Sequence, residues 1–114
     1  MKNNTRIRSW AIAALIVGTI CGIGSRSYSA PPPGADTFKA KCAMCHGPDG
    51  AGNTPMGQRL KIKDLRSPEV QKQTDAELTA IIANGKPPMP AYAKTLSADD
   101  IQSLIAYIRS IAKS

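Results

Sequence analysis

The 114-residue sequence contains few aromatic side chains, one histidine and three cysteines. Aromatic residues make up 4% of the chain, as one Phe, one Trp and three Tyr. So few rings give a thin core, because a small domain buries only part of the surface that its unfolded chain exposes. The single histidine, His46, directly follows a cysteine pair, whereas Cys21 lies far away in an apolar run. The sequence therefore lacks the second ligand pair that a structural zinc site needs.

The chain also lacks a hydrophobic run long enough to span a bilayer. Its longest apolar stretch, residues 11–23, is shorter than the roughly 20 residues that a transmembrane helix needs. Basic residues precede this stretch and small residues follow it, at Lys2, Arg6, Arg8, Ser25, Ser27 and Ser29. This pattern resembles a secretory signal peptide. We therefore predict that residues 1–29 are a cleaved signal for export to the periplasm and that residues 30–114 form one domain, with an uncleaved membrane anchor as the alternative.

The net charge of +7 depends strongly on this segment. The chain has 15 basic and 8 acidic side chains, and four of the basic ones lie in residues 1–29, which leaves 11 basic against 8 acidic in the predicted domain. No basic run interleaved with aromatic residues occurs in residues 30–114. The sequence thus predicts neither nucleic-acid binding nor stable membrane insertion after cleavage.

Cys42, Cys45 and His46 form the strongest motif in the sequence. On a helix, positions i, i+3 and i+4 share one face, so the three side chains can address the same flat ligand. A Cys-x-x-Cys-His pattern is typical of covalent haem attachment. The thiols would add to the two vinyl groups as thioethers, and His46 would coordinate the iron. The motif therefore predicts one covalently bound haem c.

A Cys-x-x-Cys pair is also found in thioredoxin-like redox sites, and this alternative stays open. Such a site follows a strand in a βαβ unit, and the sequence shows neither feature. Once Cys21 has left with the signal, thioether formation would consume both remaining cysteines. No disulfide would then be available in the mature chain.

Capping and turn residues predict an all-α domain. We expect a first helix over residues 34–46 and an irregular segment to about residue 66, from which Leu60 and Leu65 point inward. Cap signals predict a short helix over 68–72, a helix from Thr74 to Asn84 and a closing helix after Ser97. Glycines in the loop at residues 47–53 suggest backbone that passes close to a large ligand. Ile101, Leu104, Ile105, Ile108 and Ile111 mark the buried face of the closing helix.

With these features established, residues 34–112 resemble a class I c-type cytochrome with one haem. The resemblance implies a small cytochrome c fold, with three main helices and a short one wrapped around the haem. Gly34 and Phe38 match the family's first helix, and Tyr107 matches the aromatic residue of its last helix. Residues 84–92 are similar to the family's distal loop, whose methionine is the sixth iron ligand. The resemblance also suggests that the Pro55 carbonyl accepts a hydrogen bond from the second ring nitrogen of His46.

We predict Met89 as the distal ligand. No second histidine exists, and a lysine is protonated near neutral pH. Met44 lies between the two thioether positions, and Met56 lies only ten residues past His46, so it is the rival and is expected to serve as packing. Met89 comes after an intervening helix, between Pro88 and Pro90. Candidates for contact with the haem propionates are Arg59, Lys61 and Lys86.

The predicted function is one-electron transfer by a soluble, monomeric carrier that exchanges electrons with redox partner proteins. Two filled axial positions leave no open site for substrate, so the chain is not expected to be an enzyme. Two alternatives remain: a haem-based ligand sensor, and a cytochrome subunit permanently docked to a larger dehydrogenase or oxidase.

Overall fold

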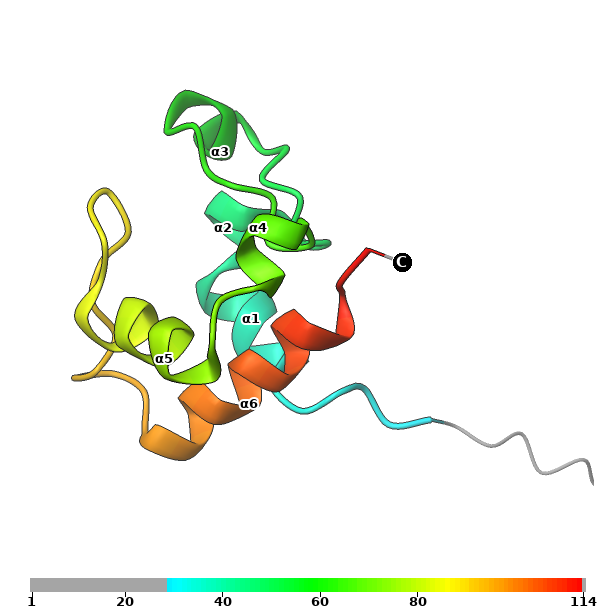
Figure 1. Ribbon diagram of the computed structural model, residues 1–114, viewed down its shortest axis with the longest axis vertical. Coiled ribbons are helices and arrows are strands. Elements are labelled where there is room, and N and C mark those ends of the chain that lie inside the picture. The colour runs from blue at the N-terminus through cyan, green and yellow to red at the C-terminus, as the bar shows by residue number, and fades with distance from the viewer. Residues whose placement is uncertain (1–28, 114) are drawn as a thin grey trace, which may run out of the picture.

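The computed structural model describes residues 29–113, so all but the last residue of the predicted signal peptide lies outside the described residues. Within residues 29–113 the chain forms six helices and no β-strand, which confirms the all-α prediction (Figure 1). The helices are α1 (Ala35–Lys41), α2 (Ala43–His46), α3 (Pro55–Arg59), α4 (Pro68–Gln71), α5 (Asp75–Asn84) and α6 (Ala98–Ser110).

Local capping fixes the starts of the last three helices, as predicted. Ser67 caps α4, which begins with a proline. Thr74 forms a capping box with Glu77, whose backbone N–H donates to the threonine hydroxyl at 3.2 Å, while the Thr74 N–H donates to the glutamate at 2.7 Å. Ser97 and Asp100 form an equivalent box at the start of α6. Each box satisfies backbone N–H groups that have no partner inside the helix.

The core forms where α1 crosses α6 (Figure 1). Phe38 is only 2% exposed, and its ring centroid lies 4.8 Å from that of Tyr107 on α6. Phe38 and Tyr107, which the resemblance assigned to the first and last helices, are thus in contact. The core cluster contains no charged or polar side chain among the described residues, and its members are Phe38, Val70, Leu78, Ile82, Leu96, Ile101, Leu104, Ile105 and Ile108. Ile111, predicted in the same face, lies beyond the end of α6 and is half-buried.

Two features differ from the predicted helices. The helix expected over residues 34–46 is broken at Cys42, whose φ of −115° ends α1 and begins α2. The segment expected to be irregular contains α3, which Thr54 caps by accepting a hydrogen bond from the Gly57 N–H at 2.8 Å. In Figure 1, α3 lies at the far end of the molecule from α6.

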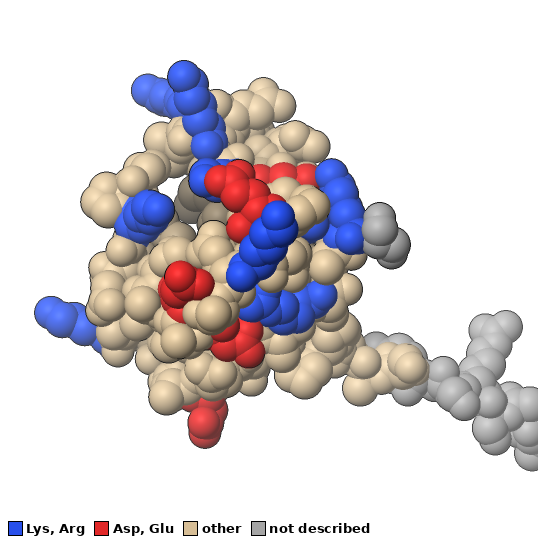
Figure 2. All heavy atoms as spheres, viewed as in Figure 1, with Lys and Arg blue, Asp and Glu red and all other residues tan. Residues whose placement is uncertain are grey.

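Charged side chains of both signs are mixed over the face shown in Figure 2. Arg66 pairs with Asp64 at 2.9 Å, and Lys113 pairs with the same carboxylate at 2.9 Å. Arg109 on α6 reaches Asp75 at the start of α5, at 2.7 Å. The pairs made by Lys113 and Arg109 join segments that are distant in sequence, whereas Arg66 and Asp64 are two residues apart. None of the helices in residues 29–113 is long and apolar enough to cross a membrane.

Candidate functional site

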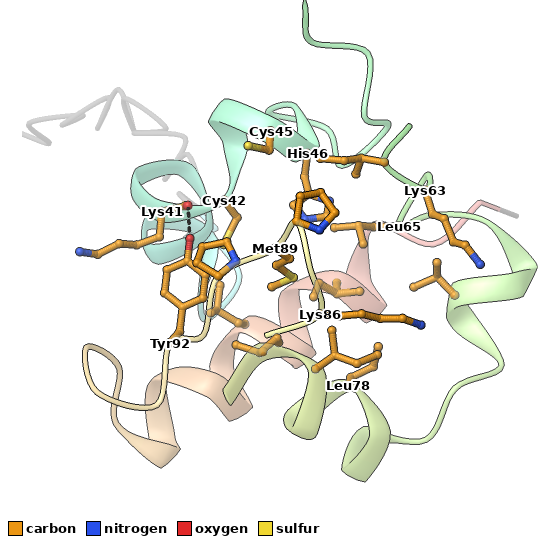
Figure 3. Close-up of a pocket in the computed structure, with 18 of the residues that line it drawn as sticks. Lys41, Cys42, Cys45, His46, Lys63, Leu65, Leu78, Lys86, Met89 and Tyr92 are labelled. Carbon is orange, nitrogen blue, oxygen red and sulfur yellow. Dashed lines mark hydrogen bonds between the residues drawn. The ribbon is translucent and has the colours of Figure 1, made fainter. Parts of the chain in front are cut away.

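A largely apolar cavity of about 280 Å³ opens between the helices. Figure 3 shows the side chains that converge on it. Its apolar lining comes from α1, α4, α5, α6, the segment after α3 and the loop after α5, and includes Phe38, Leu60, Ile62, Leu65, Val70, Leu78, Ile81, Ile82, Pro87, Pro88, Met89, Pro90, Leu104 and Ile108. Leu60 and Leu65 thus point inward, as predicted. A cavity with this lining suits a large apolar ligand.

The three residues of the motif, Cys42, Cys45 and His46, all line this cavity. Although the helix is broken at Cys42, the N–H groups of Cys45 and His46 both donate to the Cys42 carbonyl, at 3.2 and 2.9 Å. This single turn keeps the three side chains together. The predicted grouping of these residues is therefore present in the folded chain.

The Cys42 thiol does not have the electrostatic character of a redox-active cysteine. Burial, together with the neighbouring Cys45, raises the pKa of the Cys42 thiol to about 11. Dithiol oxidoreductases depend on a thiolate with a lowered pKa, so this environment disfavours the thioredoxin-like alternative. Among the described residues, no three His, Cys, Asp or Glu side chains are grouped to hold a metal ion, which likewise argues against a zinc site there.

His46 contributes a neutral imidazole to the cavity. Burial lowers the pKa of His46, which favours the uncharged ring and leaves one nitrogen with a free lone pair. Its Nδ1 atom is buried and has no hydrogen-bond partner within residues 29–113. The predicted hydrogen bond to the carbonyl of Pro55, the first residue of α3, is therefore not present in this structure. A buried ring nitrogen without a protein partner favours a site that holds a further group.

Helix α3 and its cap pack against the backbone of the motif, a role that the sequence did not lead us to predict. The Thr54 hydroxyl donates to the Cys45 carbonyl at 2.8 Å. A Cβ atom on Gly57 would lie 2.5 Å from the same carbonyl oxygen, so only glycine allows α3 to approach this closely. The signal was available, because Thr54-Pro55 repeats the cap-and-proline pattern of Ser67-Pro68.

Met89 reaches the same cavity from the loop after α5. The loop is closed by two backbone hydrogen bonds between Lys86 and Met89, of 3.1 and 2.8 Å. In Figure 3 the Met89 side chain lies within the pocket, as does the ring of His46. Met56 does not line the cavity and is 40% exposed, so its expected packing role is also wrong. Met44 is 77% exposed.

Four lysines contribute to the cavity lining: Lys41, Lys61, Lys63 and Lys86. Two of the three predicted propionate contacts, Lys61 and Lys86, belong to this set, whereas Arg59 does not line the cavity. Lys41 and Lys63 were missed, although Lys41 directly precedes Cys42. The glycine-rich loop at residues 47–53 contributes nothing to the lining, so the expected close approach of its backbone to the ligand is not observed.

Haem fits the residues that the cavity presents. The two thiols can bond to vinyl groups, the neutral imidazole and the methionine sulfur can each donate a lone pair to iron, and the apolar walls suit a porphyrin ring. The buried Nδ1 of His46 has no hydrogen-bond partner among the described residues.

Sequence comparison decides the family. Residues 29–108 match the family described as "Cytochrome C oxidase, cbb3-type, subunit III". The chain belongs to the cytochrome c family. Covalently bound haem c follows from this membership, as does the small all-α cytochrome c fold.

Similar proteins include both small cytochromes and parts of larger ones. Cytochrome c6 of Picosynechococcus sp. is 31% identical over 111 residues, covering 91% of this chain and 93% of that protein. The cytochrome c subunit of the quinone alcohol dehydrogenase of Gluconacetobacter polyoxogenes is 36% identical over 93 residues. That alignment covers 72% of this chain but only 19% of the subunit. The chain therefore spans about a fifth of that relative's length.

The fold is also similar to that of a solved structure. The KustC0563 c-type cytochrome aligns with a TM-score of 0.65 and 27% sequence identity. The alignment covers 70% of this chain and 98% of the solved one.

Proposed function

We propose that the chain is a one-electron carrier in which Cys42 and Cys45 hold haem c as thioethers, and His46 and Met89 are the two axial ligands. The observation that carries the proposal is that one apolar cavity gathers all four side chains, three from the turn at α2 and one from the loop after α5. The family places haem c in the protein, and this convergence supports the role of each residue.

When bound, haem supplies an Fe(III)/Fe(II) couple that accepts or gives one electron. The chain's own residues set the conditions for it. The uncharged His46 offers a lone pair without first losing a proton, and the Met89 thioether needs no deprotonation at any pH. Histidine and methionine together favour a high potential. With both axial positions taken, no site stays open for substrate, and we propose that the chain is not an enzyme.

The lysines of the cavity lining fit the carboxylate groups of haem. Lys61 and Lys86 were expected there, and Lys41 and Lys63 add two further cations. Lys63 also forms an ion pair with Glu69 and lowers the pKa of that carboxyl, to which the charge of Lys86 contributes as well. We propose that Lys41, Lys61 and Lys86, which form no ion pair among the described residues, are better placed than Lys63 for contact with a propionate.

Export and cleavage complete the proposal. Residues 1–29 act as the signal, residues 30–114 form the mature domain, and the mature protein works in the periplasm as a monomer. N-terminal sequencing of the exported protein tests this, and the expected first residue is Ala30 or a close neighbour. Recovery of only the full-length chain would contradict it.

A docked cytochrome subunit is the second candidate, and the comparisons give it specific support. The matching family is described as an oxidase subunit, and the alcohol dehydrogenase relative is a cytochrome c subunit. Both candidates use the same haem chemistry and differ in whether the chain stays bound to one partner. Mild purification from the native host distinguishes them: a free carrier elutes alone, whereas a docked subunit copurifies with an oxidase or dehydrogenase.

The covalent attachment of haem gives the sharpest test of the proposed site. Haem should stay with the denatured wild-type chain through acid and organic extraction, and Cys42→Ser or Cys45→Ser should weaken that retention. Met44→Ala is the matched control, because Met44 lies between the two cysteines but is 77% exposed. Haem that extracts cleanly from the wild type, or equally well from all variants, would overturn the assignment.

A further inference from the structure

Tyr92 links the two sides of the haem pocket. Its hydroxyl donates a hydrogen bond of 3.1 Å to the carbonyl oxygen of Lys41, which is 51 residues earlier in the chain. Figure 3 shows this bond as a dashed line at the edge of the pocket, with the Tyr92 ring beside Cys42. Tyr92 and Lys41 both line the cavity. The bond therefore joins the end of α1 to the segment that carries Met89.

The Lys41 carbonyl is available because the helix breaks at the next residue. In a continuous helix it would accept from the N–H four positions later, that of Cys45. Here the Cys45 N–H donates to the Cys42 carbonyl instead, at 3.2 Å. A helix end leaves such carbonyls without an internal partner, and a side chain can take their place. The Tyr92 hydroxyl does so for Lys41.

Two backbone hydrogen bonds anchor Tyr92 and the residue after it to α5. The Tyr92 N–H donates to the Ile82 carbonyl at 3.0 Å, and the next N–H, that of Ala93, donates to Ala83 at 3.0 Å. Only two residues separate Tyr92 from Met89. Because Tyr92 is held and this connection is short, the position of Tyr92 limits how far Met89 can move from the cavity.

We propose that Tyr92 is a positioning residue whose hydroxyl latches the Met89 loop across the pocket and keeps the distal face of the iron closed to external ligands. This inference rests on the proposed role of Met89 as distal ligand. The hydrogen bond is made when the loop is closed and is lost when the loop moves away from α1. It therefore adds only to the stability of the closed state, which an incoming ligand must open.

Tyr92→Phe tests the latch, because it removes the hydroxyl and keeps the ring. Imidazole is titrated into the ferric holoprotein at neutral pH, and its binding is followed by loss of the weak sulfur-to-iron charge-transfer band. A single neutral hydrogen bond within reach of water corresponds to about a fivefold change in an equilibrium constant. We expect imidazole to bind Tyr92→Phe about fivefold more tightly than the wild type, while the band is still present before imidazole is added.

Tyr107→Phe is the matched control. The Tyr107 hydroxyl also donates to a backbone carbonyl, that of Pro48 at 3.3 Å, but it joins α6 to the loop after His46 and not to the Met89 segment. Its loss should leave the imidazole affinity within twofold of the wild type. An unchanged affinity in Tyr92→Phe, or an equal increase in both variants, would overturn the latch while the band still identifies Met89 as ligand. If Met89→Ala retains the wild-type band, the proposed ligand set fails and the latch with it.

Discussion

A Cβ atom on Gly34 would lie 2.2 Å from the carbonyl oxygen of Ser103, where the start of α1 meets α6. Gly34 also has a φ of +82°, in the left-handed region that side chains rarely adopt. No residue larger than glycine can occupy this position unless one helix moves. The close contact between α1 and α6 thus depends on a glycine at position 34.

Gly34→Ala should lower the free energy of unfolding of the holoprotein by about 3 kcal/mol, because it combines backbone strain with overpacking. Denaturant unfolding followed by circular dichroism measures the change. Gly47→Ala is the control, since Gly47 has a φ of +79° but its Cβ would only approach a side-chain oxygen of Asp49, at 3.1 Å. Its cost should be about 1 kcal/mol. Equal losses in the two variants would show that the α1–α6 contact contributes nothing specific.

Asp64 should make stability depend on pH in acid. Its hydrogen bonds to Arg66, and then that to Lys113, hold the pKa of this carboxyl well below its usual value of 3.8. A carboxylate with a lowered pKa stabilises the folded state above its unfolded pKa, and this contribution is lost as the pH falls below about 3.8.

Asp64→Asn should therefore cost about 1 kcal/mol at pH 7, and the difference from the wild type should shrink as the pH is lowered from 4 toward 2. Urea unfolding at several pH values measures it. The control is Asp99→Asn, because Asp99 is exposed and has no ion pair in the described part of the chain. A pH-independent effect of Asp64→Asn would contradict the assignment.

Gly85 should control the position of Met89. Its φ is +75°, and a Cβ atom there would lie 2.8 Å from the Met89 carbonyl oxygen and 2.8 Å from the Ala91 nitrogen. Gly85→Ala should push the loop away and weaken the bond from Met89 to iron. If the weaker bond destabilises the ferrous state by about 1.4 kcal/mol relative to the ferric state, the midpoint potential falls by about 60 mV.

Gly50→Ala is the matched control for Gly85→Ala. Gly50 has a nearly equal φ of +76°, but its Cβ would meet the end of the Ile111 side chain, which can move. Redox titration should show a potential close to that of the wild type. A similar fall in both variants would mean that general strain, and not displacement of Met89, lowers the potential.

The parts of the fold that the sequence predicted are those set by local chemistry. The caps at Ser67, Thr74 and Ser97 depend on residues within one turn, and all three helices start where these caps indicate. The same capping rule predicts a helix that starts at Pro55 after the cap Thr54, which is where α3 begins. The missed helix is therefore an error of interpretation and not a limit of the sequence.

Other features depend on contacts between distant residues and could not be predicted locally. The break at Cys42 involves neither glycine nor proline, and the freed Lys41 carbonyl is paired by Tyr92 from the other side of the pocket. Lys63 likewise lines the cavity from the segment after α3, among side chains that come from other parts of the chain. The motif identified the cofactor, whereas the residues that shape its surroundings became visible only in three dimensions.

The visible absorption spectrum of two methionine variants tests the central claim most directly. In the ferric holoprotein, Met89→Ala should lose the weak sulfur-to-iron charge-transfer band, and its ferrous form should bind carbon monoxide, because the distal position is open. Met56→Ala should keep the band and stay closed to carbon monoxide, because Met56 lies outside the cavity. A band that survives in Met89→Ala and disappears in Met56→Ala would contradict the account.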